Sequence, residues 1–172
     1  MSKCLYIGLI LFFSALLQII FGNTHLIIPL VTLSIFYLTI VFGWEEGIIS
    51  AVLSGILLDI LYGRTFFLSS IVGIAAVFLA MIWLYKGEPG IILLQMIPSG
   101  LISLLYILPY SYYTFHVTEY GFLLALENIG LLIISCAIST IIFPLLIKLL
   151  DIINAPLGFD LYKTSQKKII KH

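Results

Sequence analysis

The chain of 172 residues is 62% hydrophobic and only 9% charged. Soluble domains carry about 25% charged residues, so this composition excludes a water-soluble domain and predicts a protein whose solvent is the lipid bilayer. Eight basic residues balance eight acidic ones, which excludes the positively charged surface that nucleic-acid binding requires.

Apolar blocks along the chain predict an all-α fold, a bundle of six transmembrane helices. Charged and turn-forming residues separate blocks at 4–22, 26–42, 47–61, 66–85, 91–114 and 122–147. Each transmembrane helix needs about 20 apolar residues, so little of the chain is left for a domain outside the membrane. Residues 1–153 are therefore predicted to form one transmembrane domain and residues 154–172 a basic cytoplasmic tail.

Prolines indicate where these helices begin and where they bend. Pro29 and Pro89 stand near the starts of the second and fifth blocks, where the first-turn amides have no helical partner. Pro98, Pro109 and Pro144 lie inside the last two blocks and are expected to kink or break those helices.

The distribution of basic residues predicts the orientation. With six crossings and both termini in the cytoplasm, seven of the eight Lys and Arg residues lie on the inner side and only Arg64 lies outside. This asymmetry follows the positive-inside rule. The lysines of the tail are expected to contact anionic membrane lipids.

The most specific pattern lies between the second and fourth blocks. Small or acidic residues recur there at every fourth position, as Gly43, Gly47, Ala51, Gly55, Asp59 and Gly63. Such positions share one helix face, and small side chains allow another helix backbone to approach closely in lipid. The third block is therefore predicted to be the central helix, and the six residues to form a site for helix packing and partner binding. Generic packing without a specific activity is the alternative.

Asp59 needs a compensating partner, because an ionisable side chain near a helix centre costs about 2.5–3.5 kcal/mol in the bilayer. One interpretation is a structural cap near the outer end, which reaches interfacial water or pairs with Arg64. The other is a buried cluster in which Asp59 accepts hydrogen bonds from Ser or Tyr hydroxyls. Glu127 in the sixth block is a second candidate polar position.

These residues resemble a known family. Pro29 followed by a long apolar run and then by Gly43, Gly47, Gly55, Asp59 and Gly63 is similar to the MreD rod shape-determining membrane proteins. Pro144-Leu145-Leu146 followed by Lys148 is similar to the closing segment of that family. The family often has an acidic or polar residue soon after its first proline, where this chain has Leu30.

The resemblance implies a six-helix protein of the bacterial inner membrane, with both termini cytoplasmic and a fold like that of energy-coupling-factor S-components. It implies a non-enzymatic scaffold of the elongation (rod) complex, which maintains cell shape and supports lateral cell-wall and peptidoglycan synthesis. The expected partners are MreC, MreB, RodA and a penicillin-binding transpeptidase. An exposed apolar face would bind the single transmembrane helix of MreC.

Motifs of catalysis are missing from the sequence. It has no nucleophile elbow, phosphate-binding glycine loop, paired histidines or Cys-x-x-Cys, so no enzymatic activity, metal or cofactor is predicted. The main alternative function is a substrate-binding S-component of a vitamin transporter. Its pocket would use outer-loop residues, namely Asn23, His25, Arg64, Tyr113, His116 and Glu119. An enzyme acting on lipid is a third class.

Overall fold

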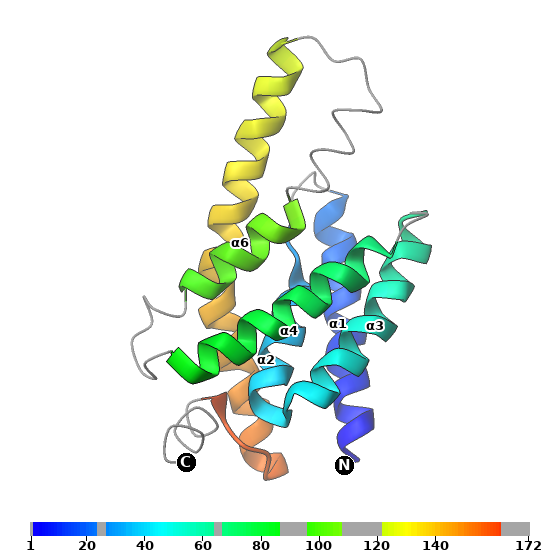
Figure 1. The fold of residues 1–172 in the computed structure, drawn as a ribbon, viewed down its shortest axis with the longest axis vertical. Coiled ribbons are helices and arrows are strands. Elements are labelled where there is room, and N and C mark those ends of the chain that lie inside the picture. Colours follow the sequence, from blue (N-terminus) through cyan, green and yellow to red (C-terminus); the bar gives the residue numbers. More distant parts are fainter. Residues whose placement is uncertain (1, 24–26, 64–66, 87–95, 108–121, 163–172) are drawn as a thin grey trace.

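The computed structural model describes residues 2–23, 27–63, 67–86, 96–107 and 122–162. Within these ranges the chain is all-helical, which confirms the predicted class, and no strand occurs among them. The helices are α1 (Lys3–Gly22), α2 (Leu30–Phe42), α3 (Trp44–Leu61), α4 (Leu68–Lys86), the helix Met96–Ile107 and α6 (Phe122–Leu157) (Figure 1).

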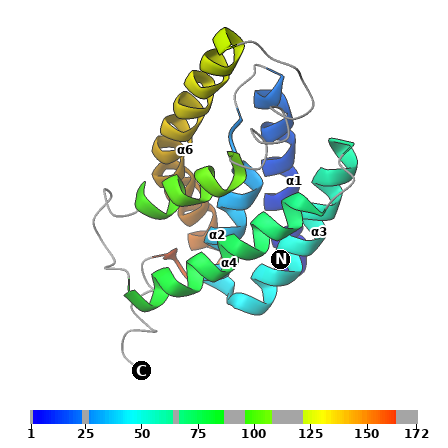
Figure 2. The same cartoon turned by 45° about the horizontal axis from the view of Figure 1, so that its top comes forward.

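α1, α2 and α3 run in alternate directions, and α6 runs back toward the end where α1 begins, whereas the helix Met96–Ile107 lies obliquely across the middle of the bundle (Figure 1, Figure 2). α1 begins where α6 finishes, and the ring centroids of Tyr6 and Phe159 lie 5.1 Å apart there. We call this the terminal end; it also contains the α2–α3 turn. α1 and α3 finish, and α2 and α4 begin, at the opposite end, which we call the distal end (Figure 1).

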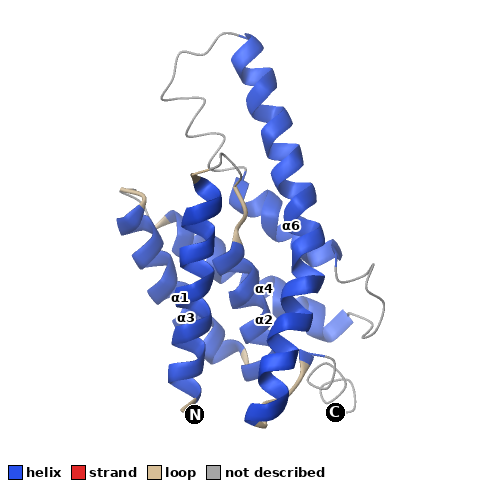
Figure 3. Cartoon of the chain, turned by 180° about the vertical axis from the view of Figure 1, so that it is seen from behind, coloured by secondary structure: helices blue, strands red, loops and turns tan. Residues whose placement is uncertain are grey.

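α2 is the central helix of the bundle. All its side chains from Leu30 to Val41 are buried, because it is apolar on every face and packs against α1, α3, α4 and α6. Seen from behind, it lies between α1 and α6 (Figure 3). The prediction that the third block is central is wrong. α3 contacts its neighbours along one face and exposes apolar residues such as Leu53 and Ile60 along the other.

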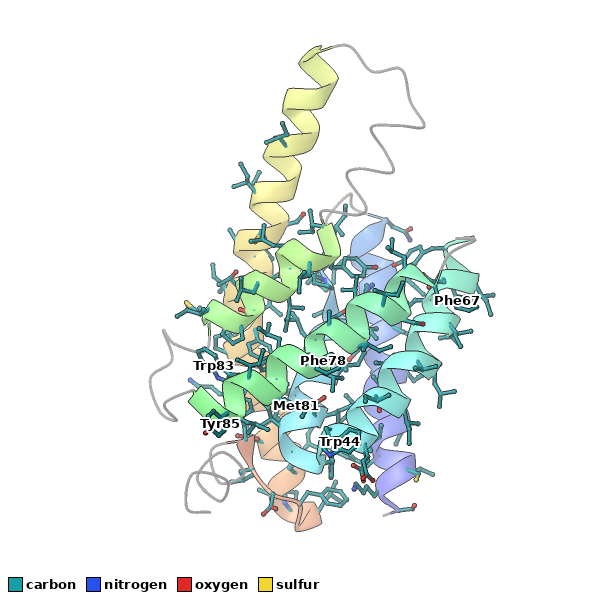
Figure 4. All side chains as sticks on the ribbon, viewed as in Figure 1. Trp44, Phe67, Phe78, Met81, Trp83 and Tyr85 are labelled. Carbon is teal, nitrogen blue, oxygen red and sulfur yellow. The ribbon has the colours of Figure 1, made fainter. Side chains whose placement is uncertain are left out.

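Among the described residues, three helical segments are long and apolar enough to cross a membrane: Lys3–Gly22, Leu68–Tyr85 and Ile133–Leu157. α2 and the helix Met96–Ile107 are apolar but shorter. Large apolar side chains cover the outer surface, among them Phe78 and Met81 of α4 (Figure 4). The chain is therefore a helical membrane protein by length, composition and surface.

Two predicted helix starts differ from the structure. α2 begins at Leu30 and not at residue 26, because Ile27–Pro29 is not helical and Pro29 directly precedes the first helical residue. α3 begins at Trp44 and not at residue 47, so that Glu45 and Glu46 occupy its first turn. Acidic side chains are favourable there because they oppose the positive end of the helix dipole.

The last predicted helix is too short. α6 is continuous through Pro144 and ends at Leu157, ten residues after the predicted end at residue 147. Pro144 does not break the helix, and Gly158, with a φ of 72°, ends it. Pro98 lies within the helix Met96–Ile107, whereas Pro109 and the rest of the 91–114 block lie outside the described residues.

Candidate helix-packing site

The α2–α3 turn brings the first two residues of the predicted site together. Gly43 has a φ of 109°, a conformation that L side chains rarely adopt, and its N–H donates to the Thr39 carbonyl oxygen at 3.0 Å. One turn later, Gly47 packs against the Thr39 side chain. A Cβ atom at Gly47 would lie closer than 3.0 Å to Thr39 Oγ1, so glycine is what lets α2 and α3 meet.

α3 and α4 make the most extensive helix–helix contact among the labelled helices. A Cβ atom on Gly55 would lie closer than 3.0 Å to the Cα and N atoms of Ser70, which are backbone atoms that no rotamer change can move. A Cβ atom on Gly73 would lie 3.0 Å from Ala51 Cβ. Small residues on both helices therefore hold the two backbones at close range, the geometry that favours association in lipid.

Asp59 joins the same two helices at the distal end. Its side chain is 4% exposed, and both of its carboxylate oxygens accept the Ser69 N–H, at 3.2 and 3.1 Å. Ser69 is in the first turn of α4, where backbone amides have no helical acceptor and the dipole favours an anion. Asp59 therefore caps α4 from α3. This partner is a backbone amide of the next helix, which neither interpretation of Asp59 named, and Arg64 lies outside the described residues.

The remaining candidate residues have other positions. Gly63 has a φ of 63° in the turn after α3, and a Cβ atom there would meet nothing within 4 Å. Gly43 and Gly63 thus form turns, whereas the four residues between them contact neighbouring helices. Pro29 precedes α2. Arg64 lies outside the described residues, and Glu127 lies in α6 with its side chain outside the described part.

A polar contact at the distal end was missed by the sequence analysis. Gln18 of α1 is 3% exposed; its Oε1 accepts the Val31 N–H and its Nε2 donates to Tyr106 Oη, both at 3.0 Å. Nearby, Ser135 Oγ accepts the Ile27 N–H at 3.2 Å. These bonds satisfy backbone amides around the non-helical Ile27–Pro29 segment, as buried irregular backbone requires. A single glutamine inside a long apolar run was the available signal.

A second missed cluster lies at the terminal end. Tyr37 of α2 donates to Asp151 Oδ1 at 2.7 Å and accepts a bond from Asn154 Nδ2 at 2.8 Å. Asp151 Oδ1 also accepts the Tyr162 N–H at 3.1 Å. Burial raises the pKa of the Tyr162 hydroxyl, so this group stays protonated at neutral pH. The cluster joins α2 to α6 and to the segment after it.

An ion pair joins α1 to the α2–α3 turn at the same end. Lys3 Nζ contacts Glu46 Oε1 and lies 5.3 Å from the centre of the Phe42 ring. Both ionic side chains are partly exposed, so water weakens their attraction. The pair holds the start of α1 in place and contributes little to stability.

Comparison with protein-family models, with curated proteins and with solved structures finds no match to this chain. Among the residues that the structure describes, no group of three or more His, Cys, Asp and Glu side chains is arranged to hold a metal ion. The described residues form a helix-packing site whose polar side chains hydrogen-bond to other parts of the bundle.

Proposed function

We propose that this chain is a non-enzymatic membrane scaffold of the elongation (rod) complex, with the role of the MreD proteins that it resembles. The observation that carries this proposal is that Gly47, Ala51 and Gly55 all face neighbouring helices inside the bundle. They fix α2, α3 and α4 to one another at close range. The result is a rigid core whose outer surface is left for lipid and for other membrane proteins.

The scaffold crosses the bacterial inner membrane six times with its terminal end in the cytoplasm. The alternating helix directions support an even number of crossings, since α1 begins and α6 finishes at the same end (Figure 1). The bias of Lys and Arg supports the cytoplasmic assignment. α2 and the helix Met96–Ile107 are the two shortest of the six proposed crossings.

The outer face of α3 is the docking surface for the transmembrane helix of MreC. Four large aliphatic residues form its exposed row: Ile49, Leu53, Leu57 and Ile60. Their spacing of three or four positions places them on one side of the helix, as a helix-binding surface requires. The opposite side of α3 is fixed against α4 at backbone range, so this row does not move relative to the bundle. Through MreC the scaffold meets MreB, RodA and the penicillin-binding transpeptidase.

Site-specific photocrosslinking in a rod-shaped bacterium tests this surface. A photoreactive residue at Leu53, which is 64% exposed, is expected to capture MreC. The matched control is Leu145 on α6, which is 60% exposed and lies on a different helix. Capture from Leu145 and not from Leu53 would contradict the docking surface and leave the scaffold role standing.

Depletion of the protein tests the scaffold role itself. Loss of the protein is expected to turn rods into spheres, because lateral wall synthesis would lose its membrane coupling. Cells that stay rod-shaped and instead fail to take up a vitamin would contradict the scaffold and support the S-component alternative. Of the residues named for the pocket of that alternative, Asn23 follows α1, and the others lie outside the described residues: His25, Arg64, Tyr113, His116 and Glu119.

A further inference from the structure

The chain closes the terminal end of the bundle with a short segment after α6. Gly158, with its positive φ, ends α6, and we call residues 158–162 the C-terminal turn. The Tyr162 ring stacks on the Tyr37 ring of α2, with centroids 6.0 Å apart and planes 9° apart, and Tyr162 is fully buried. The Tyr162 N–H donates to Asp151 Oδ1 of α6 at 3.1 Å. The far end of the turn is therefore docked on two helices.

The near end of the turn docks on α1, α2 and the last turn of α6. Phe159 packs against Tyr6 and Phe42 at centroid distances of 5.1 and 5.3 Å. The Phe159 N–H donates to the Asn154 carbonyl oxygen at 3.3 Å, and Asn154 Nδ2 donates to the Asp160 carbonyl oxygen at 3.4 Å. Aromatic contacts and a few hydrogen bonds thus hold the turn against the bundle.

Three buried oxygens at this contact have no hydrogen-bond partner among the described residues: Tyr6 Oη, Asn154 Oδ1 and Tyr162 Oη. Trp83 of α4 lies close to Tyr162 Oη but forms no hydrogen bond of normal geometry with it. One of the three oxygens belongs to the turn, and the other two belong to residues that contact it. The unpaired oxygens are therefore gathered where the turn meets the bundle.

These oxygens weaken the docked state. A buried oxygen without a partner has given up its hydrogen bonds to water and gained none in return, so it destabilises the state that buries it. One other oxygen of this kind in the described part, Ser103 Oγ, is in the helix Met96–Ile107. Undocking of the turn would let water reach the three oxygens at the terminal end and remove that cost.

We propose that the C-terminal turn is a releasable latch, which undocks as a unit while α1, α2 and α6 stay folded. The stacked rings and hydrogen bonds hold the latch, and the unpaired oxygens keep that hold weak. The basic tail begins at residue 163, directly after Tyr162, so a molecule that binds the tail acts on the latch first. Release uncovers the Tyr6 and Tyr37 rings at the end of the bundle. The latch does not depend on the rod-complex role.

Hydrogen exchange of the full chain in detergent, followed by mass spectrometry, tests whether the turn opens by itself. The Phe159 and Tyr162 amides are hydrogen-bonded and are expected to be protected. Their protection is expected to be roughly tenfold or more below that of α2, because a local opening leaves the bundle folded. Equal protection of the turn and α2 would overturn the proposal, and so would a turn that exchanges as fast as an unfolded peptide.

The same chemical change at two tyrosines is expected to have opposite effects. Tyr6→Phe removes an unpaired hydroxyl and keeps the ring contacts with Phe42 and Phe159, so protection of the turn should rise several-fold. Tyr37→Phe is the matched control. It removes a hydroxyl whose two hydrogen-bond partners also bond to the turn, so protection should fall several-fold. Unchanged or lower protection in Tyr6→Phe would overturn the proposal.

Tyr162→Ala gives an independent measurement, because it removes the stacked ring and not a single hydroxyl. Exchange of the turn is expected to approach the rate of an unfolded peptide, whereas α2 should keep its protection to within a few-fold. A weakly held latch contributes only its own docking free energy to the bundle, which explains the small change in α2. An equally large loss of protection in α2 would show that the turn is part of the core and would overturn the proposal.

Discussion

The α3–α4 interface and the polar site at the terminal end hold the same bundle together by opposite means. Where α3 and α4 approach most closely the residues are small, and Gly55 and Gly73 leave no room for a side chain between the two helices. At the terminal end the side chains are large, and Tyr37 and Tyr162 join helices through stacking and hydrogen bonds. Because lipid tails are as apolar as the helices, the hydrophobic effect does not drive helix association in the membrane. Close packing and hydrogen bonds must stabilise the bundle instead.

Of the substitutions that compare these two regions, Gly55→Leu is expected to lower the stability of the bundle the most. The new side chain meets the Ser70 backbone, which cannot move without separating α3 from α4. Unfolding in detergent should become easier by about 3 kcal/mol or more, and MreC should no longer co-purify. Gly8→Leu in α1 is the matched control, because a Cβ atom there meets nothing within 4 Å. Unchanged stability and partner yield in Gly55→Leu would refute the close interface.

Substitutions of Asp59 test the hydrogen bond between its carboxylate and the Ser69 N–H at the α3–α4 interface. Asp59→Leu leaves the Ser69 N–H without its acceptor and should cost about 2 kcal/mol in unfolding free energy. Asp59→Asn keeps one acceptor oxygen and should cost about half as much. Equal losses in the two variants would show that the negative charge at the start of α4 matters more than the hydrogen bond.

Tyr37→Phe is the corresponding change at the terminal end. It removes the bonds to Asp151 and Asn154 and keeps the ring, so a loss of about 1–2 kcal/mol is expected. Tyr85→Phe is the control, because Tyr85 is highly exposed on α4 (Figure 4). A double-mutant cycle of Tyr37→Phe with Asp151→Asn should show non-additive losses. Additive losses would mean that the two residues do not interact.

Glu46→Gln should have the smallest effect. The Lys3–Glu46 pair is partly exposed, so its loss is expected to change the unfolding free energy by less than about 1 kcal/mol. The difference from wild type should shrink further at high salt, because salt screens exposed pairs. Glu45→Gln provides the baseline for an exposed acidic residue in the same turn. A large, salt-independent loss would place this pair among the main contacts of the terminal end.

Composition and spacing were sufficient to predict the helical membrane class and several elements of the site. The fourfold spacing of Gly47, Ala51 and Gly55 is a local property of one helix, so the sequence shows which face is small. It does not show which helix occupies that face. Ser70 and Gly73 complete the contact from α4, and only the packed structure identifies them as the partners.

The central helix and the end of α6 were predicted less well for a physical reason. Burial of α2 depends on how four neighbours surround it, and an apolar block in a membrane protein looks the same whether it faces lipid or protein. Lys148 and Asp151 suggested a helix end near residue 147. In the structure Asp151 accepts a hydrogen bond from Tyr37 within the helix, and α6 continues to Leu157.

The short length of α2 has a consequence for biogenesis. Its 13 residues extend roughly 20 Å, well below the approximately 30 Å of hydrocarbon in a bilayer. The irregular backbone before it is satisfied from both ends of the chain, since Gln18 of α1 accepts the Val31 N–H and Ser135 of α6 accepts the Ile27 N–H. A nascent chain that has not yet inserted α6 therefore lacks the partner of the Ile27 amide, so the start of α2 is expected to reach its final structure only after the last helix is in place.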